Sequence, residues 1–248
     1  MEKILEFKEM VAASKNMVFF GGAGVSTESD IPDFRSKKGL YNTQEAYGYE
    51  PEYLLSIDCF EERQELFFRY YKENMVHQDA LPNAAHKALA QMERKGILRW
   101  IITQNVDGLH QAAGSHKVLE LHGANSRQYC VECSFPYGLY YVLDIKNNDG
   151  FVPKCDCGGV VRPDVVLYGE TLDEKVINIA VKAIRAADLL IVGGTSLAVY
   201  PASGLIHHLP SKGKMVLINK DSTPYDKDAD LVINDSIGKV LSAICDLL

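Results

Sequence analysis

Met17-Val-Phe-Phe-Gly-Gly-Ala-Gly24 is the stretch that decides the fold of this 248-residue chain. Its four consecutive apolar residues predict a short strand that is buried on both faces, which is typical of a parallel sheet. The glycines predict a tight turn whose backbone N–H groups can come close to a phosphate. Alone the turn is a weak signal, because the third glycine of the dinucleotide fingerprint and the Lys-Ser/Thr pair of a P-loop are missing. A plain tight turn is the competing interpretation.

A second strand of the same character ends in a similar turn. The run from Asp188 to Gly193 is apolar, and Gly193-Gly-Thr-Ser196 closes it. Two glycine-rich turns at the carboxyl ends of parallel strands favour a ligand bound in the crevice between them.

Strands and helices alternate along most of the chain. Helices are predicted over residues 2–15, 51–76, 83–95, 173–187, 201–208 and 237–247, and strands over residues 17–20, 98–102, 118–121, 165–168, 188–193, 214–219 and 230–234. This pattern predicts an α/β fold with a doubly wound, Rossmann-like parallel sheet, formed by residues 1–40, 78–125 and 162–248. The helical insertion 41–77 and the cysteine-bearing segment 126–161 break the alternation. Together they are predicted to form a smaller lobe, with 126–161 as a zinc-binding module.

The charge balance and hydropathy exclude some classes of protein. With 26 basic and 33 acidic residues the net charge is −7, which argues against a broad nucleic-acid-binding face and is compatible with a basic peptide partner. No apolar run reaches the roughly 18 residues that a transmembrane helix needs. The first ten residues are charged and amphipathic, unlike a secretory signal, so a cytoplasmic location with reduced thiols is expected. The oligomeric state is left open.

Four of the six cysteines are clustered in a metal-type pattern. Cys130 and Cys133 are followed after 21 residues by Cys155 and Cys157. Two close pairs of thiolates are typical of a structural, tetrahedral zinc site. The second pair is one residue shorter than the usual spacing, and the glycines behind it can relieve the tighter turn. A redox pair or free thiols are the alternative.

Polar residues follow two other predicted strands. Thr103-Gln-Asn-Val-Asp107 carries amide and carboxylate groups suited to ribose hydroxyls or a carboxamide, although an Asx turn that starts a helix is the simpler interpretation. His122 follows the strand that ends at Leu121, and an imidazole with a pKa near neutrality is suited to general-base work. The other six histidines are expected to face solvent or to pack against helices. Asp33-Phe-Arg35 lies in a long polar loop, where the arginine could pair with a phosphate.

Taken together these stretches resemble the sirtuin family of NAD-dependent protein-lysine deacylases, in particular its bacterial deacetylases. The matching stretches follow the family's order from about residue 19 to 237: Gly22 to Arg35, Thr103 to His110, Leu121 to Gly123, the four cysteines, Arg162 to Glu170, Gly194 to Ala202, and Ile218-Asn219. Each is weak by itself, but the set is very specific.

The resemblance implies a role for each matching residue. NAD would be held by Ala23, Gly24, Thr27, Phe34, Arg35, Gln104, Asn105, Val106, Asp107, His122, Thr195, Ser196, Asn219, Lys220 and Ile237. His122 and Asn105 would be catalytic, with His122 as the base that activates a ribose hydroxyl. An extended acetyl-lysine peptide would be clamped by strand addition between Val166, Leu167, Tyr168, Gly169 on one side and Ala198, Val199 on the other. Cys130, Cys133, Cys155 and Cys157 would bind one structural zinc ion.

The implied reaction consumes NAD as a substrate and transfers the acetyl group of acetyl-lysine to ADP-ribose, with release of nicotinamide. Family members that remove succinyl groups carry a Tyr-x-x-Arg pair, and an ungapped alignment places Phe68 and Tyr71 at those positions. Without a cation there, acetyl or another neutral acyl group is favoured. A protein ADP-ribosyltransferase and a non-catalytic, NAD-sensing zinc module are the alternatives. A hydride-transferring dehydrogenase is disfavoured by the incomplete fingerprint.

Overall fold

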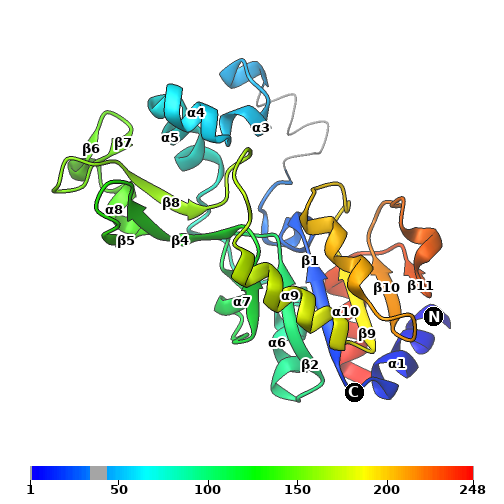
Figure 1. Cartoon of the computed structure of the whole chain (residues 1–248). Coiled ribbons are helices and arrows are strands. Elements are labelled where there is room, and N and C mark those ends of the chain that lie inside the picture. Colours follow the sequence, from blue (N-terminus) through cyan, green and yellow to red (C-terminus); the bar gives the residue numbers. More distant parts are fainter. Residues whose placement is uncertain (1, 34–43, 248) are drawn as a thin grey trace.

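The computed structural model describes residues 2–33 and 44–247, and shows a large lobe built on a parallel sheet beside a smaller lobe of short helices and strands (Figure 1). Phe34 and Arg35, both predicted to contact NAD, lie outside the described residues. Within the described ranges, none of the helices combines the length and the apolar character that crossing a membrane requires.

The sheet of the large lobe has six parallel strands in the order β11-β10-β9-β1-β2-β3. The strands are β1 (Met17–Gly21), β2 (Leu98–Thr103), β3 (Val118–Glu120), β9 (Leu189–Gly193), β10 (Lys214–Ile218) and β11 (Leu231–Ile233). Every residue of β1 and β9 is buried, because helices cover both faces of the sheet. The predicted doubly wound α/β fold is confirmed.

Alternate residues of β1 supply two separate hydrophobic cores. Met17 and Phe19 face a core that includes side chains from α1 (Glu2–Ala13), α6 (Ala84–Arg94) and α10 (Ile237–Leu247). Val18 and Phe20 face the other core, which is formed with α9 (Glu174–Ala186) and the 3-10 helix η4 (Ala202–His208). Full burial of such a side chain stabilises the fold by roughly 1.5–3 kcal/mol. Because β1 buries side chains on both of its faces, it stabilises the helix layers on both sides of the sheet.

The strand order reverses between β1 and β9, and the two glycine-rich turns meet there. From β1 the chain proceeds through β2 and β3 to one edge, and from β9 through β10 and β11 to the other. The backbone N–H of Gly24 donates to the carbonyl of Gly194 at 2.8 Å. Gly194 has a φ of +60°, and a Cβ there would lie 2.4 Å from the backbone nitrogen of Val25. Only glycine permits this approach, which opens a crevice at the switch point of the sheet.

The smaller lobe combines both predicted insertions around one core. Its helices are α3 (Pro51–Leu54), α4 (Ile57–Glu62), α5 (Gln64–Asn74) and α8 (Leu139–Leu143), and its strands are β4 (Gly123–Cys130), β5 (Pro136–Gly138), β6 (Asn148–Asp149), β7 (Val152–Pro153) and β8 (Val161–Val165). Strands β5, β4 and β8 form an antiparallel sheet. Phe60 and Phe67 of the helical part pack in one cluster with Cys130 and Val161 of the cysteine-bearing part. The two insertions therefore stabilise each other.

Most predicted elements are confirmed, and one strand was placed wrongly. A strand was expected over Val165–Tyr168, but β8 ends at Val165 and the following residues form a turn. β8 belongs to the small antiparallel sheet with β4, which itself crosses the predicted boundary between residues 125 and 126. The exact domain boundaries stay a prediction. Short elements complete the fold: α7 (Leu109–Ala112) and the 3-10 turns η1 (Ala23–Val25), η2 (Thr27–Ser29), η3 (Ile145–Asn147) and η5 (Asp226–Asp228).

Candidate active site

A cleft of about 650 Å³ lies at the carboxyl ends of the parallel strands. All the described residues predicted to contact NAD line it: Ala23, Gly24, Thr27, Gln104, Asn105, Val106, Asp107, His122, Thr195, Ser196, Asn219, Lys220 and Ile237. The predicted peptide-binding residues Val166, Leu167, Tyr168, Gly169 and Val199 line the same cleft, whereas Ala198 does not. The fold therefore brings together residues that are up to about 215 positions apart in the sequence.

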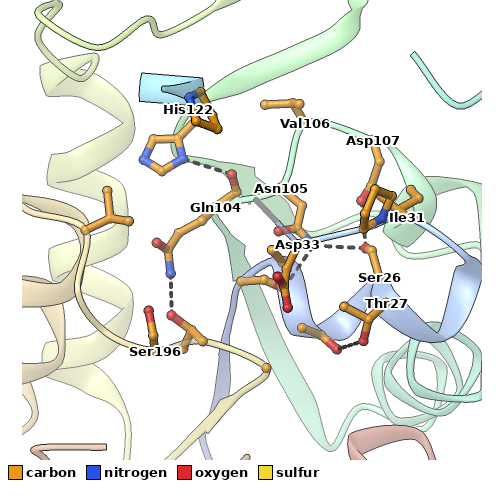
Figure 2. A pocket seen from close by; sticks show the side chains of 18 of the residues that line it. Ser26, Thr27, Ile31, Asp33, Gln104, Asn105, Val106, Asp107, His122 and Ser196 are labelled. Carbon is orange, nitrogen blue, oxygen red and sulfur yellow. Dashed lines mark hydrogen bonds between the residues drawn. The ribbon is translucent and has the colours of Figure 1, made fainter. Parts of the chain in front are cut away.

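The loop after β2 is joined to the glycine-rich turn after β1 by side-chain hydrogen bonds (Figure 2). Asn105 Nδ2 donates to the Gly22 carbonyl at 3.1 Å and to Ser26 Oγ at 3.0 Å. Ser26 Oγ in turn donates to Asp107 at 2.7 Å, and the other carboxylate oxygen of Asp107 accepts from the Leu109 N–H at 2.8 Å. The predicted Asx turn is present at Asp107. Through Ser26, the Asp107 carboxylate also holds the loop after β2 against the glycine-rich turn.

A second chain of hydrogen bonds connects β2 to β9 and β10. Gln104 Nε2 donates to Thr195 Oγ1 at 3.1 Å, and the Thr195 N–H donates to Asn219 Oδ1 at 3.0 Å. Nδ2 of Asn219 is buried in the cleft with no partner among the described residues. A buried amide donor without an acceptor favours a ligand oxygen at this position. The donor fits the hydroxyl groups at the adenosine end of NAD. The glycine turns would bind the phosphates of the same molecule.

His122 lies at the edge of the cleft, next to the Gln104 backbone. Its Nδ1 lies 2.9 Å from the carbonyl oxygen of Gln104. Because a carbonyl can only accept, Nδ1 carries the proton, and Nε2 of the neutral ring is the basic nitrogen. Burial lowers the pKa of His122 below its ordinary value of 6.5, and the hydrogen bond to Gln104 opposes this effect only in part. The imidazole is therefore neutral and able to accept a proton near pH 7.

The backbone of His122 also holds the segment that follows β8. The Val166 N–H donates to the His122 carbonyl at 3.0 Å. Further along, the Tyr168 N–H donates to Leu55 and its carbonyl accepts from Ile57, at 3.0 and 2.9 Å. The segment is thus supported by the large lobe at one end and by the helical insertion at the other.

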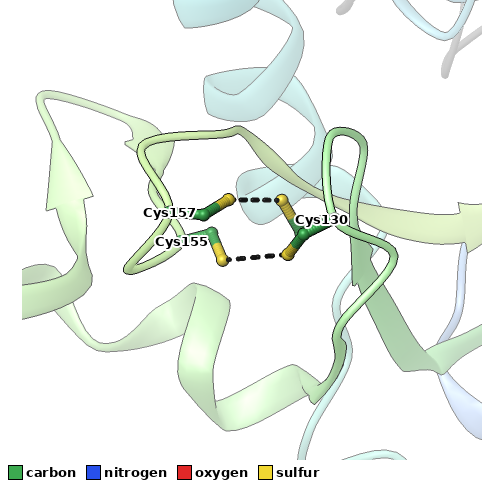
Figure 3. A group of neighbouring side chains, drawn as sticks. Cys130, Cys155 and Cys157 are labelled. Atoms are coloured by element: carbon green, nitrogen blue, oxygen red, sulfur yellow. Dashed lines mark hydrogen bonds between the residues drawn. The ribbon is translucent and has the colours of Figure 1, made fainter.

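The four clustered cysteines form a compact group away from the cleft (Figure 3). Their sulfur atoms all lie within 4.8 Å of one another, with Cys130 and Cys157 3.5 Å apart and Cys133 and Cys155 3.6 Å apart. Tetrahedral zinc with Zn–S bonds of about 2.3 Å requires sulfur–sulfur distances of about 3.8 Å, so the group fits one ion. The Tyr137 hydroxyl donates to Cys155 Sγ at 3.0 Å, as outer-shell donors do at metal thiolates.

A comparison with protein families agrees with this geometry. The Sir2 family profile matches residues 22–201, which include the first glycine turn, His122 and the four cysteines. This chain belongs to the Sir2 family.

Curated Sir2 relatives match over nearly their whole length. The NAD-dependent protein deacetylase of Clostridium acetobutylicum is 56% identical over 245 residues, which cover 98% of both chains. That of Clostridium tetani is 57% identical over 97% of this chain and 96% of the relative. Among solved structures, Sir2 with a p53 peptide and NAD+ has a TM-score of 0.87 at 38% identity and covers 98% of this chain and 97% of that chain. A Sir2 variant with deacetylated p53 peptide and 3'-O-acetyl-ADP-ribose has a TM-score of 0.90 at 36% identity, with 98% of both chains covered.

Some residues of this Sir2 site were not among those predicted from the sequence. Ser26 joins Asn105 to Asp107, and its place in the glycine-rich motif was the available signal. Asn125 lines the cleft, and its Nδ2 donates to the Met75 carbonyl at 2.6 Å while its Oδ1 accepts from the Tyr71 hydroxyl at 3.2 Å. No sequence signal marked Asn125, because its partners come from other elements. Tyr71 packs in the small-lobe core and also lines the cleft.

Proposed function

We propose that this protein is an NAD-dependent protein-lysine deacetylase that transfers the acetyl group of an acetyl-lysine side chain to ADP-ribose. The observation that carries the proposal is the position of His122. Its protonated Nδ1 is fixed on Gln104, and the ring borders a cleft shared by the glycine turns and the Val166 segment. Relatives that are more than half identical over nearly the whole chain have this activity in their names.

The residues at the switch point are suited to bind NAD in an extended form. The turns after β1 and β9 would receive its phosphates, and Asn219 would meet its adenosine end through the unpartnered amide. When bound, NAD supplies an electrophilic ribose carbon from which nicotinamide leaves. Asn105 and Asp107 would border the nicotinamide, held in place by Ser26. His122 would take a proton that a ribose hydroxyl gives up as that hydroxyl attacks the acyl carbon.

The backbone of the segment Val166–Gly169 is suited to add one strand of substrate. Its N–H groups at Val166, Leu167 and Tyr168 already have acceptors. Among the described residues, the carbonyl of Val166 and the N–H of Gly169 have no assigned partner. Both residues line the cleft, and these two groups would bond the peptide backbone or the acetylated side chain. Val199, and with it Ala198, would close the other side.

A neutral acyl group is the group expected to be removed from lysine. Lys220 is the one lysine among the described residues that line the cleft, and no arginine joins it. Lys220 follows β10, whereas Leu55, Tyr71 and Met75 line the end of the cleft formed by the helical insertion. The Tyr71 hydroxyl is already engaged by Asn125 and Gln128. A succinyl carboxylate at this end would therefore meet no lysine or arginine among the described residues, which is costly for a buried charge.

A cytoplasmic location belongs to the same proposal. All six cysteines are free in the structure, including the four that fit zinc, as is usual in a reducing compartment.

The decisive experiment incubates the purified protein with NAD and an acetyl-lysine peptide, and measures nicotinamide and the peptide mass. We expect one nicotinamide released per acetyl group removed, and a slower reaction with the matching succinyl-lysine peptide. His122→Ala should lower kcat by about 10²–10⁴-fold, as expected for loss of a general base.

The matched control is His116→Ala, since the His116 side chain is exposed and lies away from the cleft. Full activity in His122→Ala would exclude the proposed base. Transfer of ADP-ribose to protein without any loss of acetyl groups would replace the proposal with a transferase.

A further inference from the structure

An ion pair between a buried arginine and a partly buried glutamate lies next to the segment that would bind the peptide. Arg162, on β8, is 4% exposed, and its Nη1 and Nη2 donate to the two carboxylate oxygens of Glu170 at 2.7 and 2.9 Å. Each of the other ion pairs between described residues has one side chain that is at least 52% exposed. Solvent screens those pairs, so the two-pronged Arg162–Glu170 pair is the one with a fixed geometry.

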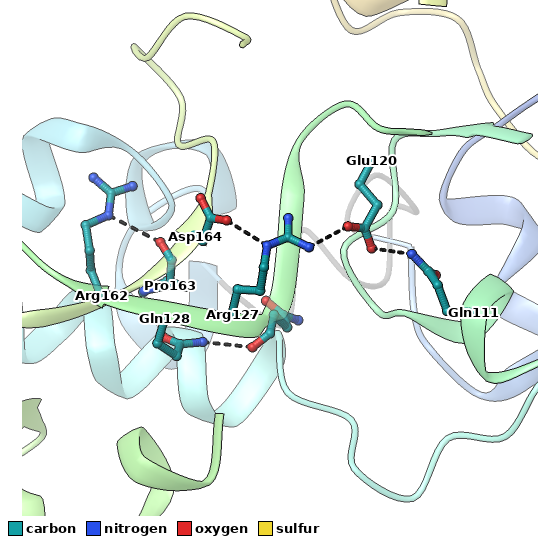
Figure 4. Close-up of polar contacts among 8 residues, drawn as sticks. Gln111, Glu120, Arg127, Gln128, Arg162, Pro163 and Asp164 are labelled. Atoms are coloured by element: carbon teal, nitrogen blue, oxygen red, sulfur yellow. Dashed lines mark hydrogen bonds and ion pairs between the residues drawn. The ribbon is translucent and has the colours of Figure 1, made fainter. Parts of the chain in front are cut away.

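The rest of the Arg162 guanidinium is held by the same strand and by two rings. Nη2 also donates to the Val165 carbonyl at 3.0 Å. Nε donates to the Pro163 carbonyl at 3.4 Å, as Figure 4 shows. The guanidinium carbon lies 5.0 Å from the ring centre of Phe60 and 5.8 Å from that of Tyr129. Arg162 is therefore fixed between α4 and β4, where aromatic faces compensate part of its burial.

Glu170 connects Arg162 to the peptide-binding segment through hydrogen bonds to the backbone of Leu167. Its Oε2 accepts from the Leu167 N–H at 2.8 Å, and its own N–H donates to the Leu167 carbonyl at 3.0 Å. Both backbone groups of Leu167 are thus engaged. Burial alone would raise the pKa of Glu170, but the Arg162 and Leu167 hydrogen bonds hold it below its ordinary value, so the carboxylate is ionised at neutral pH.

We infer that Arg162 and Glu170 are positioning residues, which shape the turn so that Val166 and Gly169 present their unpartnered backbone groups to an acyl-lysine peptide. The inference rests on the proposed function. Buried ion pairs contribute little net stability on average, so stability alone does not account for this one. Its effect on function would be to fix the turn from Leu167 to Glu170, which lies outside the strands. Arg162 does not line the cleft, whereas Glu170 does, and neither is among the residues predicted to hold NAD.

The test compares Glu170→Gln with the wild type on three substrates. For a peptide of ten or more residues we expect KM to rise about tenfold, because a charge-assisted hydrogen bond that shapes the turn is lost. The KM for NAD and kcat should stay within about twofold, since the cofactor loops are untouched. A single acetyl-lysine amide, which lacks the flanking peptide units, should show a much smaller change in KM.

Asp164→Asn is the matched control. Asp164 lies on the same strand, but pairs with Arg127 at the surface, where it is 49% exposed (Figure 4). We expect it to leave all three KM values unchanged. Arg162→Lys keeps the charge but not the planar fork, and should reproduce the peptide defect. It also replaces Glu170→Gln in the comparison if that variant does not fold.

An unchanged peptide KM in both variants would overturn the inference. A parallel rise in the KM for peptide and NAD, with a fall in kcat, would also overturn it, because that outcome indicates general damage. Calorimetric titration of wild type and variants with the acetylated peptide measures the same difference without turnover. The positioning role can therefore be tested even if the proposed reaction fails.

Discussion

Single residues acquire their chemistry here from neighbours that are distant in sequence. His122 is one of seven histidines, and nothing in its own side chain separates it from the others. The Gln104 carbonyl fixes the proton on Nδ1 and burial disfavours the imidazolium, and both suit His122 to the proposed role of base. His116, only six positions away, is exposed and has neither constraint.

The pH dependence of catalysis follows from the state of His122. Because its pKa lies below 6.5, the neutral form predominates above that pH, and the base is lost as pH falls through the lowered value. We therefore expect kcat/KM for the acetyl-lysine peptide to be flat between pH 7 and 8 and to fall on the acid side below about pH 6.5. The measurement is a profile of kcat/KM from pH 5 to 9. An acid limb centred above pH 7 would contradict this assignment.

Elements differ in how much of their position the sequence could predict. The strands β1, β9 and β10 are continuous apolar runs, and such runs are read directly as buried parallel strands. The run Val165-Val-Leu167 has the same composition, but it ends a strand and turns, because Arg162 and Glu170 take its backbone groups. Composition reports that a segment is buried, and it does not report which hydrogen bonds that segment makes.

The cysteine-bearing module is expected to depend on bound zinc for its folded structure. Its four thiols lie within 4.8 Å of one another, next to short strands of two to eight residues. Cys157→Ser should abolish the stoichiometric zinc, lower the melting temperature by about 10 °C or more, and reduce deacetylation with it. Zinc per chain, measured by atomic emission, and thermal unfolding test this.

Cys245→Ala is the control, since Cys245 is buried in the large-lobe core and far from the cluster in the fold. One zinc per chain in Cys157→Ser, with unchanged stability, would exclude the four-thiolate site.

At the scale of the whole molecule, two of the other histidines pack against helices, as expected, and they also pack against each other. His86 and His110 are fully or almost fully buried, with their ring centres 4.7 Å apart between α6 and α7. Among the described side chains, Nε2 of His86 and both ring nitrogens of His110 are buried without a partner. Burial lowers the pKa of His86 to about 4 and that of His110 to about 3, with each depressed below 6.5.

This pair makes the stability of the fold sensitive to acid. The folded state keeps both rings neutral, whereas the unfolded chain takes up protons below pH 6.5, so the stability is present above that pH and is lost as pH falls towards 4. Each histidine contributes a slope of up to about 1.4 kcal/mol per pH unit in that range. Urea unfolding at pH 7, 6 and 5 gives the free energy of unfolding at each pH. That free energy should fall less steeply with decreasing pH in His110→Phe than in the wild type. Equal slopes would contradict neutral burial, and His116→Ala should keep the wild-type slope.

The sequence by itself determined the apolar strands, the glycine turns, the cysteine spacing and the membership of the Sir2 family. These are local signals, carried by residues that are adjacent or a fixed number of positions apart. Only the tertiary structure decided that Nδ1 of His122 carries the proton, that Ser26 joins Asn105 to Asp107, and that Arg162 and Glu170 support the Val166 segment. The physical reason is that the order of strands in the sheet, set by the packing of both faces, determines which strand ends meet. Hydrogen bonds between those ends form only after that order is in place.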